Sequence, residues 1–448
     1  MPNHILINRK INSYKEKIEV TSDKSISIRC VLLASIAVGV SKIANILESE
    51  DVLNSLKAIK KLGIDYKKRK NILEIKGLGL NGYNPKKNTV INAGNSGTLA
   101  RCLIGICAKI KNQIKIVGDK SLSKRDFSRV TEPLKNFGLK IKSNNGFLPV
   151  KIQGSNFLRP IKFIENKGSA QIKTSLIFCG LNTPGTTIIR ARKSRNHTEL
   201  LLKNLNLPIK VKSEGNYDNI EIKGLNQFKA FNYDVPGDIS SASFFIVLTL
   251  LSKKSELLIK KVNVNKSRLG IIKILNMMNA KIKLQNKRLY KGEEIADIFV
   301  KSNNNFKSIN CPSSLNSSAI DELILIICLA SAKAKGVSTF RELGELNKKE
   351  SKRLDIAIKF LKMIGIKTIR NKDNVKIYGN PSLNLKGKYV VKNFLKDHRI
   401  FMMSVIAALT LGGEWKIYDK SSFKTSFPKF LNILTKLGAK INWKEEKT

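Results

Sequence analysis

LKAIKKLGI, residues 56–64, is a helical run that ends on Gly63 and leads into a β-rich stretch. Five other segments share this form: LKNFGLKI (134–141), LKNLNLPIKV (202–211), ILNMMNAKI (274–282), LKMIGIKTI (361–369) and LNILTKLGAKI (431–441). Gly or Asn after an apolar run is typical of a helix end, where a positive φ is often required. The recurrence, roughly every 70–85 residues, indicates an internal repeat.

Each punctuating residue is followed by apolar and polar residues in alternation, the two-residue period of half-buried strands. Four copies close on EIKG, VKIQG, EIKG and VKIYG, whose last residues are Gly77, Gly154, Gly224 and Gly379. One unit therefore reads helix, turn, strand, turn, strand, Gly. Such a unit is too long for common solenoids, whose repeats span about 20–50 residues. Six units in 448 residues predict two domains of three units each.

Composition narrows the class of protein. Of the 448 residues, 42% are hydrophobic, and the longest apolar runs, 31–40 and 323–332, are shorter than the roughly 20 residues of a membrane span. The first 25 residues contain no apolar signal core, so we expect a cytoplasmic protein. The six Cys have no metal-ligand spacing and lie mostly in apolar runs, which predicts buried, reduced thiols.

The net charge of +48 has two interpretations. Basic proteins attract phosphates, on nucleic acids or on small molecules. Lys and Asn are abundant throughout the chain, however, which indicates compositional drift, and no basic tail or zinc finger accompanies them. The cations that indicate anion binding are therefore the Arg residues and the Lys residues within motifs.

Several motifs of the first half place cations and small polar residues before helices. SDKSISIR (22–29) predicts a capped helix beginning near Ile26, and NAGNSGTLAR (92–101) a loop whose amides can surround an anion. GDKSLSKRDFSRVTEPL (118–134) carries Arg125, which can clamp a carboxylate or phosphate. The first string is also compatible with an ordinary cap, the second with a plain strand-to-helix turn and the third with a solvated loop.

Two more strings continue the series. GSAQIKTSLIFCGL (168–181) opens an apolar helix with Ser169 and Gln171, which suit a polar ligand or simple capping. SRNHTELLLKNL (194–205) brings Arg195 and His197 to another helix start, where we expect a capping or surface His.

The second half repeats the scheme with carboxylates. SSAIDELILIICLA (317–330) places Asp321 and Glu322 at the expected start of an apolar helix, where the helix dipole favours acids and a general base is also possible. LNKKESKRLDIAI (346–358), DHRIFMMSVIAAL (397–409) and SSFKTSFPKFLNIL (421–434) also precede or open helices. Convergent helix N-termini predict a positive field for small anionic substrates bound between two domains.

In this order the motifs resemble those of the 3-phosphoshikimate 1-carboxyvinyltransferase (enolpyruvylshikimate-phosphate synthase) family, over essentially the whole chain. The resemblance implies an α/β (α+β) fold of two similar domains, each an inside-out barrel of three βαβαββ units. It implies a lower domain of residues 1–23 plus 238–448, an upper domain of 24–237 and an active site in the cleft between them.

The resemblance also implies the reaction. The enolpyruvyl group of phosphoenolpyruvate passes to the 5-hydroxyl of shikimate 3-phosphate by addition and elimination, and phosphate is released. No metal or organic cofactor takes part, and the enzyme is expected to be a cytoplasmic monomer whose partners are its small-molecule substrates. We also expect inhibition by glyphosate, because Gly97 is retained.

Residue roles follow from the same resemblance. Shikimate 3-phosphate is expected to contact Ser25, Arg29, Ser169, Ala170, Gln171, Arg195 and Lys349. Phosphoenolpyruvate is expected to contact Lys24, Gly97, Arg125, Arg353 and Arg399, with Gln171 near both substrates. Asp321 would take the hydroxyl proton, while Glu350 and Lys24 would protonate and deprotonate the methylene carbon.

The chain departs from the family pattern at two places. Lys352 stands where the family usually has Asp, and Thr425 aligns with a Lys found in some members, with Lys424 one position away. The roles of these three residues stay open.

Three other classes of protein share part of this pattern. A UDP-N-acetylglucosamine enolpyruvyl transferase would carry a Cys in the loop of Arg125, and none lies between Cys107 and Cys179. An RNA 3′-phosphate cyclase needs a nucleotidyl-His, for which the three His residues lack a matching context. A basic nucleic-acid-binding protein needs aromatic platforms or a recognition motif, and neither is visible.

Overall fold

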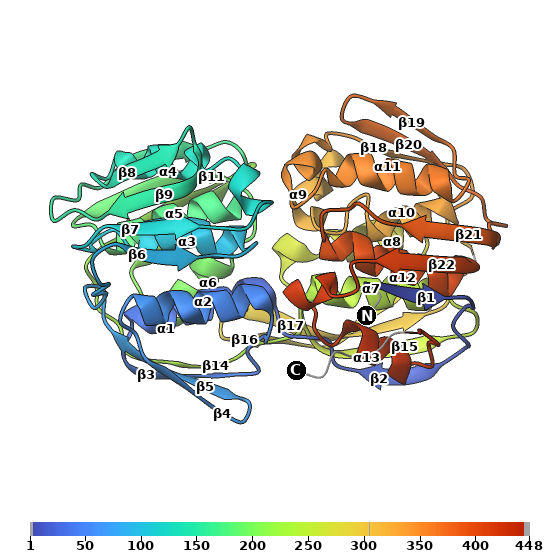
Figure 1. Ribbon diagram of the computed structural model, residues 1–448, viewed down its shortest axis with the longest axis horizontal. Helices are drawn as coiled ribbons and strands as arrows, with labels where there is room; N and C mark the ends of the chain where they lie inside the picture. Colours follow the sequence, from blue (N-terminus) through green and yellow to red (C-terminus); the bar gives the residue numbers. More distant parts are fainter. Residues whose placement is uncertain (1–2, 304, 443–448) are drawn as a thin grey trace. The chain divides into compact units, whose positions relative to one another are not determined.

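The structure is a computed structural model that describes residues 3–303 and 305–442 (Figure 1). The chain forms two compact units. Unit 1 comprises Met1–Thr21, Gly237–Arg288 and Glu294–Thr448, and unit 2 comprises Ser22–Pro236 and Leu289–Glu293. The domain bounds predicted from the sequence assign residues 289–293 to the lower domain, which corresponds to unit 1. This short segment groups with unit 2 because its side chains bond there, as in the contact of Glu293 with His197.

Unit 2 contains three four-stranded sheets, in the orders β14-β3-β5-β4, β6-β7-β9-β8 and β10-β11-β13-β12. In each sheet the first pair is parallel and the next two pairs are antiparallel. The strands are β3 (Val38–Ala44), β4 (Tyr66–Arg69), β5 (Ile72–Leu78), β6 (Thr89–Asn92), β7 (Ile114–Val117), β8 (Lys140–Asn144), β9 (Phe147–Gln153), β10 (Lys162–Glu165), β11 (Thr186–Arg192), β12 (Ile209–Glu214), β13 (Tyr217–Lys223) and β14 (Asn232–Asp234).

The helices of unit 2 are of two kinds. The central ones, α1 (Lys24–Ile36), α3 (Gly97–Ile106) and α5 (Ala170–Leu181), are apolar on nearly all sides and mostly buried, as such helices must be. The others, α2 (Glu50–Lys61), α4 (Ser128–Lys135) and α6 (His197–Asn204), carry polar residues and cover the core from one side. A 3₁₀ turn, η1 (Leu122–Lys124), precedes α4.

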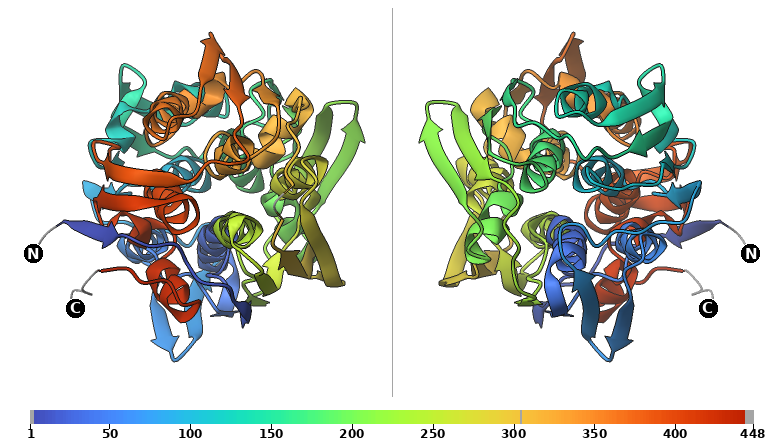
Figure 2. Two further views of the ribbon diagram at one scale, coloured as in Figure 1. Left: turned by 90° about the vertical axis from the view of Figure 1, so that its right-hand side faces the viewer. Right: turned by 90° about the vertical axis from the view of Figure 1, so that its left-hand side faces the viewer.

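Unit 1 also has three sheets in the described part of the chain, β16-β17-β15-β2, β18-β20-β19 and β1-β22-β21, of which the last two have three strands each. The helices of this unit lie toward its middle and the strands toward its periphery (Figure 2). The strands are β1 (His4–Ile7), β2 (Lys15–Ile18), β15 (Glu256–Asn263), β16 (Lys281–Tyr290), β17 (Glu293–Lys301), β18 (Val337–Phe340), β19 (Thr368–Asn371), β20 (Asn374–Tyr378), β21 (Leu385–Val391) and β22 (Gly412–Tyr418).

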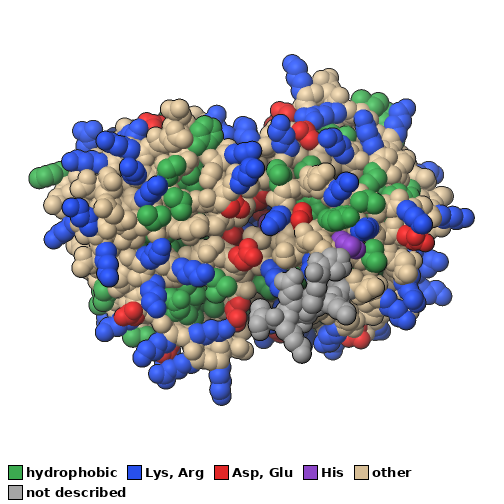
Figure 3. All heavy atoms as spheres, viewed as in Figure 1, with side chains coloured by type: hydrophobic (Ala, Val, Ile, Leu, Met, Phe, Trp, Pro, Cys, Tyr) green, Lys and Arg blue, Asp and Glu red, His purple; other side chains and the backbone are tan. Residues whose placement is uncertain are grey.

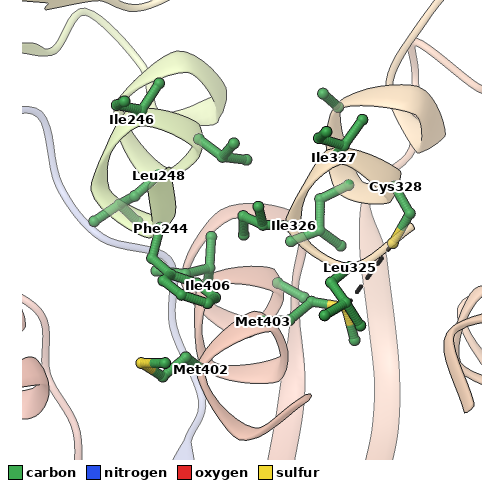
Figure 4. Packing of buried hydrophobic residues seen from close by; sticks show 14 of the residues in the cluster. Phe244, Ile246, Leu248, Leu325, Ile326, Ile327, Cys328, Met402, Met403 and Ile406 are labelled. Carbon is green, nitrogen blue, oxygen red and sulfur yellow. Dashed lines mark hydrogen bonds between the residues drawn. The ribbon is translucent and has the colours of Figure 1, made fainter. Parts of the chain in front are cut away.

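Three buried helices fill the core of unit 1: α7 (Ile239–Leu251), α10 (Ile326–Ala332) and α12 (His398–Leu411). Figure 4 shows their side chains packed together, including the sulfur atoms of Cys328 and Met403 at 3.9 Å. The remaining helices are α8 (Gly270–Met277), α9 (Asn316–Ala319), α11 (Arg353–Met363) and α13 (Phe430–Lys436), with the 3₁₀ turns η2 (Lys266–Arg268), η3 (Ser313–Leu315), η4 (Gly344–Lys348) and η5 (Ser422–Thr425).

The sixfold repeat is confirmed by the backbone. All six punctuating residues have a positive φ between 56° and 103°: Gly63, Gly138, Asn206, Asn279, Gly365 and Gly438. The predicted α/β fold with two sets of three repeats is therefore correct. In the last copy, the strand expected after Gly438 reduces to a bridge between Leu6 and Asn442, and residues 443–448 lie outside the described chain.

The four closing glycines have a packing role that explains their recurrence. A Cβ added to Gly224 would lie 1.8 Å from the Thr183 carbonyl oxygen, just beyond the end of α5. A Cβ on each of the other three would likewise lie 2.1–2.5 Å from carbonyl oxygens at the C-terminal ends of α1, α3 and α10. These belong to Ala34 and Ala37 for Gly77, to Ala108 for Gly154 and to Ala334 for Gly379. Only Gly lets the last strand of a unit pass so close to the end of its buried helix.

Within residues 3–303 and 305–442, no helix is long and apolar enough to cross a membrane. All six Cys are buried and unpaired by disulfides, as predicted. Burial raises the pKa of Cys102 and of Cys311 to about 11, so these thiols are poorly reactive at neutral pH. On the face seen in Figure 3, Lys and Arg side chains are scattered over the surface rather than gathered into one stripe.

Candidate active site

The first group of predicted site residues begins at the N-terminus of α1. Asp23 caps this helix, its Oδ1 accepting the Ile26 amide at 2.9 Å, and the helix starts at Lys24 rather than near Ile26. Lys24 Nζ donates to Asp51 Oδ2 at 2.9 Å, and its side chain is 18% exposed. The ammonium group is thus held by a carboxylate, while part of the Lys24 side chain still faces solvent.

Arg29 lies deeper than the sequence suggested. Its guanidinium donates to Thr198 Oγ1 at 2.7 Å, to Thr174 Oγ1 at 3.0 Å and to the Ser25 carbonyl at 2.9 Å. The residue is only 2% exposed. In this structure Arg29 joins α1, α5 and α6 around Ser25.

The second helix start is that of α3, where Ser96 caps the helix by accepting the Leu99 amide at 3.3 Å. Gly97 follows directly, and two guanidinium groups lie beside it. A Cβ on Gly97 would lie 2.8 Å from Arg101 Nη1 and 3.1 Å from Arg125 Nη1. Arg125 Nη2 also donates to Asn95 Oδ1 at 2.9 Å. Gly97 therefore leaves room for these two cations.

Replacing Gly97 by Ala should displace one or both guanidinium groups. If Arg125 binds phosphoenolpyruvate, as the family resemblance implies, the KM for that substrate should rise about 10-fold, the loss of roughly one charged hydrogen bond. The KM for shikimate 3-phosphate should change less. Steady-state kinetics with each substrate varied in turn measures both values. The control is Gly387→Ala, where the nearest atoms to an added Cβ are those of the Tyr389 side chain, at 3.4 Å or more.

Arg101 also lies in this region, although the sequence analysis assigned it no role. It donates to Gln171 Oε1 at 2.7 Å and to the Asp126 carbonyl at 3.0 Å, and its guanidinium lies 4.7 Å from the centre of the Phe127 ring. Burial, with the nearby Arg125 and Arg129, lowers the pKa of Arg101 to about 10, so it stays charged at neutral pH. It orients Gln171 toward the N-terminus of α3.

The start of α5 is built as predicted from capping chemistry. Ser169 caps the helix through the Ile172 amide at 3.4 Å, Ala170 is its first residue, and Gln171 Nε2 donates to Thr98 Oγ1 at 3.0 Å. The loop before it wraps around Glu165, whose carboxylate accepts the amides of residues 167, 168 and 169. This loop is thereby held in one shape ahead of Ser169.

The expectation for His197 was wrong. His197 is neither a cap nor a surface residue, because Asn196 occupies the cap position of α6 and the His197 side chain is fully buried. Its Nδ1 lies 2.6 Å from Glu293 Oε1. Arg195 lies in the connection between β11 and α6, two residues before it, and is partly exposed. The sequence held no signal for this pair, since the partners are 96 positions apart.

The second group of predicted residues lies in unit 1 around Arg353, the first residue of α11. Its guanidinium contacts Asp397 Oδ2 at 2.9 Å, Glu350 Oε2 at 2.5 Å and Asp321 Oδ1 at 3.5 Å. Arg353 is 1% exposed, whereas Glu350 keeps 21% of its side chain exposed. Burial alone would lower the pKa of Arg353, but these carboxylates raise it well above its ordinary value. Arg353 is therefore a fixed buried cation.

Asp321 sits between two guanidinium groups. Arg399 Nη2 lies 3.4 Å from Asp321 Oδ2, and Arg399 Nη1 donates to the Asp321 carbonyl at 3.3 Å. The Asp321 side chain is 13% exposed. Asp397 fixes both Arg residues, because it also caps α12 through the Arg399 amide at 3.0 Å.

The predicted position of Asp321 in a helix was wrong. The helix α10 begins at Ile326, and residues 320–325 form a turn in which Ile324 has a φ of +57°. The side chains of Leu323, Ile324 and Leu325 are all buried, so core packing outweighs helix propensity here. The turn lets Asp321 and Glu322 both face Arg399.

A buried polar chain behind Asp321 was missed by the sequence reading. Glu322 is 1% exposed, accepts a hydrogen bond from Ser240 Oγ and lies 3.7 Å from Arg399. Arg268, itself buried, donates to Ser240 Oγ at 2.7 Å and to Asp238 Oδ1 at 3.0 Å. Burial raises the pKa of Glu322, whereas the pKa of Asp397, which burial alone would also raise, is lowered by Arg353. Buried carboxylates of different basicity thus surround the two arginines.

The remaining predicted residues of unit 1 lie in or next to helical segments. Lys349 ends η4 and is partly exposed, and Lys352 precedes α11 with an exposed side chain. Lys424 and Thr425 lie in η5, both partly exposed. Over residues 3–303 and 305–442, no three His, Cys, Asp or Glu side chains are arranged to hold a metal ion.

The two groups offer complementary chemistry. In unit 2, Lys24 is the first residue of α1, and Arg101 and Arg125 lie beside Gly97 at the start of α3, a setting that favours anions. In unit 1, Asp321 is a carboxylate held by two guanidinium groups and partly open to solvent, which suits proton transfer.

Comparisons with known proteins point to one family. The model of the family described as EPSP synthase (3-phosphoshikimate 1-carboxyvinyltransferase) matches residues 8–434. A 3-phosphoshikimate 1-carboxyvinyltransferase of Ruthia magnifica subsp. Calyptogena magnifica is 40% identical over 432 residues, covering 96% of this chain and 97% of that protein. The protein of the same name from Endomicrobium trichonymphae is 38% identical, covering 96% and 98%.

Solved structures give the same result. An EPSP synthase from Acinetobacter baumannii superposes with a TM-score of 0.86 at 32% identity, covering 99% of this chain and 100% of that one. The enolpyruvyl transferase NikO from Streptomyces tendae has a TM-score of 0.71 at 12% identity, a likeness of fold alone.

Proposed function

Because the chain belongs to the EPSP synthase (3-phosphoshikimate 1-carboxyvinyltransferase) family, we propose that the two groups of side chains described above carry out its reaction. The enzyme transfers the enolpyruvyl group of phosphoenolpyruvate to the 5-hydroxyl of shikimate 3-phosphate in aromatic amino-acid biosynthesis. The products are 5-enolpyruvylshikimate 3-phosphate and phosphate.

Asp321 is the proposed base. As the 5-hydroxyl oxygen attacks C2 of phosphoenolpyruvate, its proton passes to the Asp321 carboxylate, and C3 gains a proton to become a methyl group. The tetrahedral intermediate then loses phosphate from C2 and a proton from C3, which restores the double bond. The support is geometric: Asp321 is held by Arg353 and Arg399 yet remains 13% exposed.

Glu350 and Lys24 are the proposed acid and base at C3. Both are held by ion pairs and stay partly exposed: Glu350 with Arg353 at 2.5 Å and Lys24 with Asp51 at 2.9 Å. An ion pair orients each group, and partial exposure leaves it able to reach a substrate.

Phosphoenolpyruvate is proposed to bind to Lys24, Arg125, Arg353 and Arg399 beside Gly97. Shikimate 3-phosphate is proposed to bind to Ser25, Ser169, Ala170, Gln171, Arg195 and Lys349. Arg29, at 2% exposure and with three bonds to protein groups, fits a role in positioning Ser25 better than one as a surface clamp. These assignments require that both groups of side chains act on one pair of substrates, and we propose that they do. We also propose that the enzyme is a monomer in the cytoplasm.

The observation that carries this function is the placement of Asp321 between Arg353 and Arg399 in a chain of this family. The test is phosphate release by the purified protein. Phosphate should appear only when phosphoenolpyruvate and shikimate 3-phosphate are both present, in a 1:1 ratio with enolpyruvyl product. No release with this pair, or release when UDP-N-acetylglucosamine replaces shikimate 3-phosphate, would contradict the proposal.

A further inference from the structure

Three consecutive residues at the start of α6 are buried and polar, and each is tied to a different partner. His197, Thr198 and Glu199 are 0%, 0% and 2% exposed. Thr198 Oγ1 accepts from Arg29 and lies 2.7 Å from Thr174 Oγ1. Glu199 forms a buried ion pair with Lys173 at 2.7 Å. The start of α6 is therefore fixed by side chains rather than by apolar packing.

The partner of His197 comes from a distant part of the chain. Glu293 is the first residue of β17, and its carboxylate lies 2.6 Å from His197 Nδ1, both side chains being fully buried. It stands at the tip of the β16–β17 hairpin. The tip groups with unit 2, while Arg288 and Glu294 on either side of it group with unit 1.

The hairpin tip is held against unit 2 by further contacts. The Asp234 amide donates to Tyr290 Oη at 2.9 Å, and Lys291 Nζ donates to the Asn232 carbonyl. A Cβ on Gly292 would lie 3.0 Å from the Leu200 carbonyl of α6. The carboxylate of Glu293 is thus presented to His197 by a docked turn rather than by a loose loop.

We propose that Glu293 is a positioning residue for shikimate 3-phosphate, acting through His197 on the start of α6. This inference rests on the proposed function. Thr198, next to His197, holds the Arg29 side chain beneath Ser25, and Arg195 precedes His197 by two residues. The position of Arg195, and that of Ser25 through Arg29 and Thr198, therefore depend on the position of the first turn of α6. A buried carboxylate–imidazole contact holds that turn because breaking it leaves a buried polar group unsatisfied.

The test is a comparison of Glu293→Ala, Glu293→Gln and the control Glu294→Ala. The control residue is adjacent but partly exposed, and its ion pairs are with Lys266 and Lys287 at 3.7 and 3.5 Å. For Glu293→Ala we expect the KM for shikimate 3-phosphate to rise about 10-fold or more. The kcat and the KM for phosphoenolpyruvate should stay within about twofold, which general structural damage would not produce.

Glu293→Gln keeps an oxygen that can accept from His197 Nδ1, so it should recover much of the loss. An unchanged KM for shikimate 3-phosphate in Glu293→Ala, or a parallel change in all three parameters, overturns the inference. If Glu293→Ala does not fold, calorimetric titration of Glu293→Gln with shikimate 3-phosphate decides: weaker binding than in Glu294→Ala supports it, and equal binding overturns it. Absence of turnover in the wild type would instead refute the proposed function, while the titration still reports on Glu293.

Discussion

Asp321→Asn should lower kcat by about 10²–10⁴-fold, the usual contribution of a positioned general base. Asn has the same shape and still fits between Arg353 and Arg399, but it cannot accept the hydroxyl proton. Because the substrate-binding cations stay in place, the KM values should change much less than kcat. Phosphate release under saturating substrates measures the effect.

The control for this variant is Asp373→Asn, the same change in the exposed turn between β19 and β20 of the same unit. It should leave kcat within about twofold, as expected for a surface substitution. Full activity of Asp321→Asn would remove Asp321 from the role of base and shift attention to Glu350, the other partly exposed carboxylate beside Arg353.

Arg353→Met should cause the largest loss of stability among single changes in this cluster. It removes the guanidinium that pairs with Asp397, a carboxylate that is 0% exposed and 2.9 Å away. An unpaired buried charge costs about 3–5 kcal/mol, which corresponds to a drop in Tm of roughly 6–20 °C for a unit of this size. Thermal unfolding followed by circular dichroism measures the shift.

Arg370→Met is the matched control because its ion pair with Asp355 is exposed. The side chains are 35% and 33% exposed, and such a pair contributes about 1 kcal/mol or less. Equal Tm shifts for the two variants would show that burial of the Arg353 cluster does not govern its stability. A small shift for Arg370→Met alone is the expected result.

The contribution of Arg353 to the stability of the fold should also depend on pH. Arg353 lowers the folded-state pKa of Asp397 below its unfolded value of about 3.9. The pair therefore stabilises the fold fully above about pH 4, and this contribution is lost as the pH falls through the folded-state pKa. The difference in Tm between wild type and Arg353→Met should narrow in acid.

The repeat architecture was predictable because its signals are local. A Gly or Asn at a helix end with positive φ and an alternating strand pattern each involve only a few neighbouring residues. All six predicted positions adopt that conformation. The helix starts of α1, α3, α5 and α12 were predictable for the same reason, since each is capped by Asp or Ser within three residues of the amide that it accepts.

The start of α10 was not predictable in this way. Asp321 and Glu322 precede an apolar run and read as the first turn of a helix. Burial of Leu323 and Leu325 with a left-handed Ile324 delays the helix to Ile326. Such a turn depends on the shape of the surrounding core, which no short window of sequence contains.

The sequence by itself determined the six repeats, the family of the chain and the helix starts that carry its polar motifs. Only the tertiary structure decided which charges meet. Arg353 pairs with Asp397 across 44 positions, and His197 pairs with Glu293 across 96. In a chain with 82 Lys and Arg and 34 Asp and Glu, the residue types leave many pairings open. Burial selects among them, because a charge removed from water must find a partner within hydrogen-bonding distance.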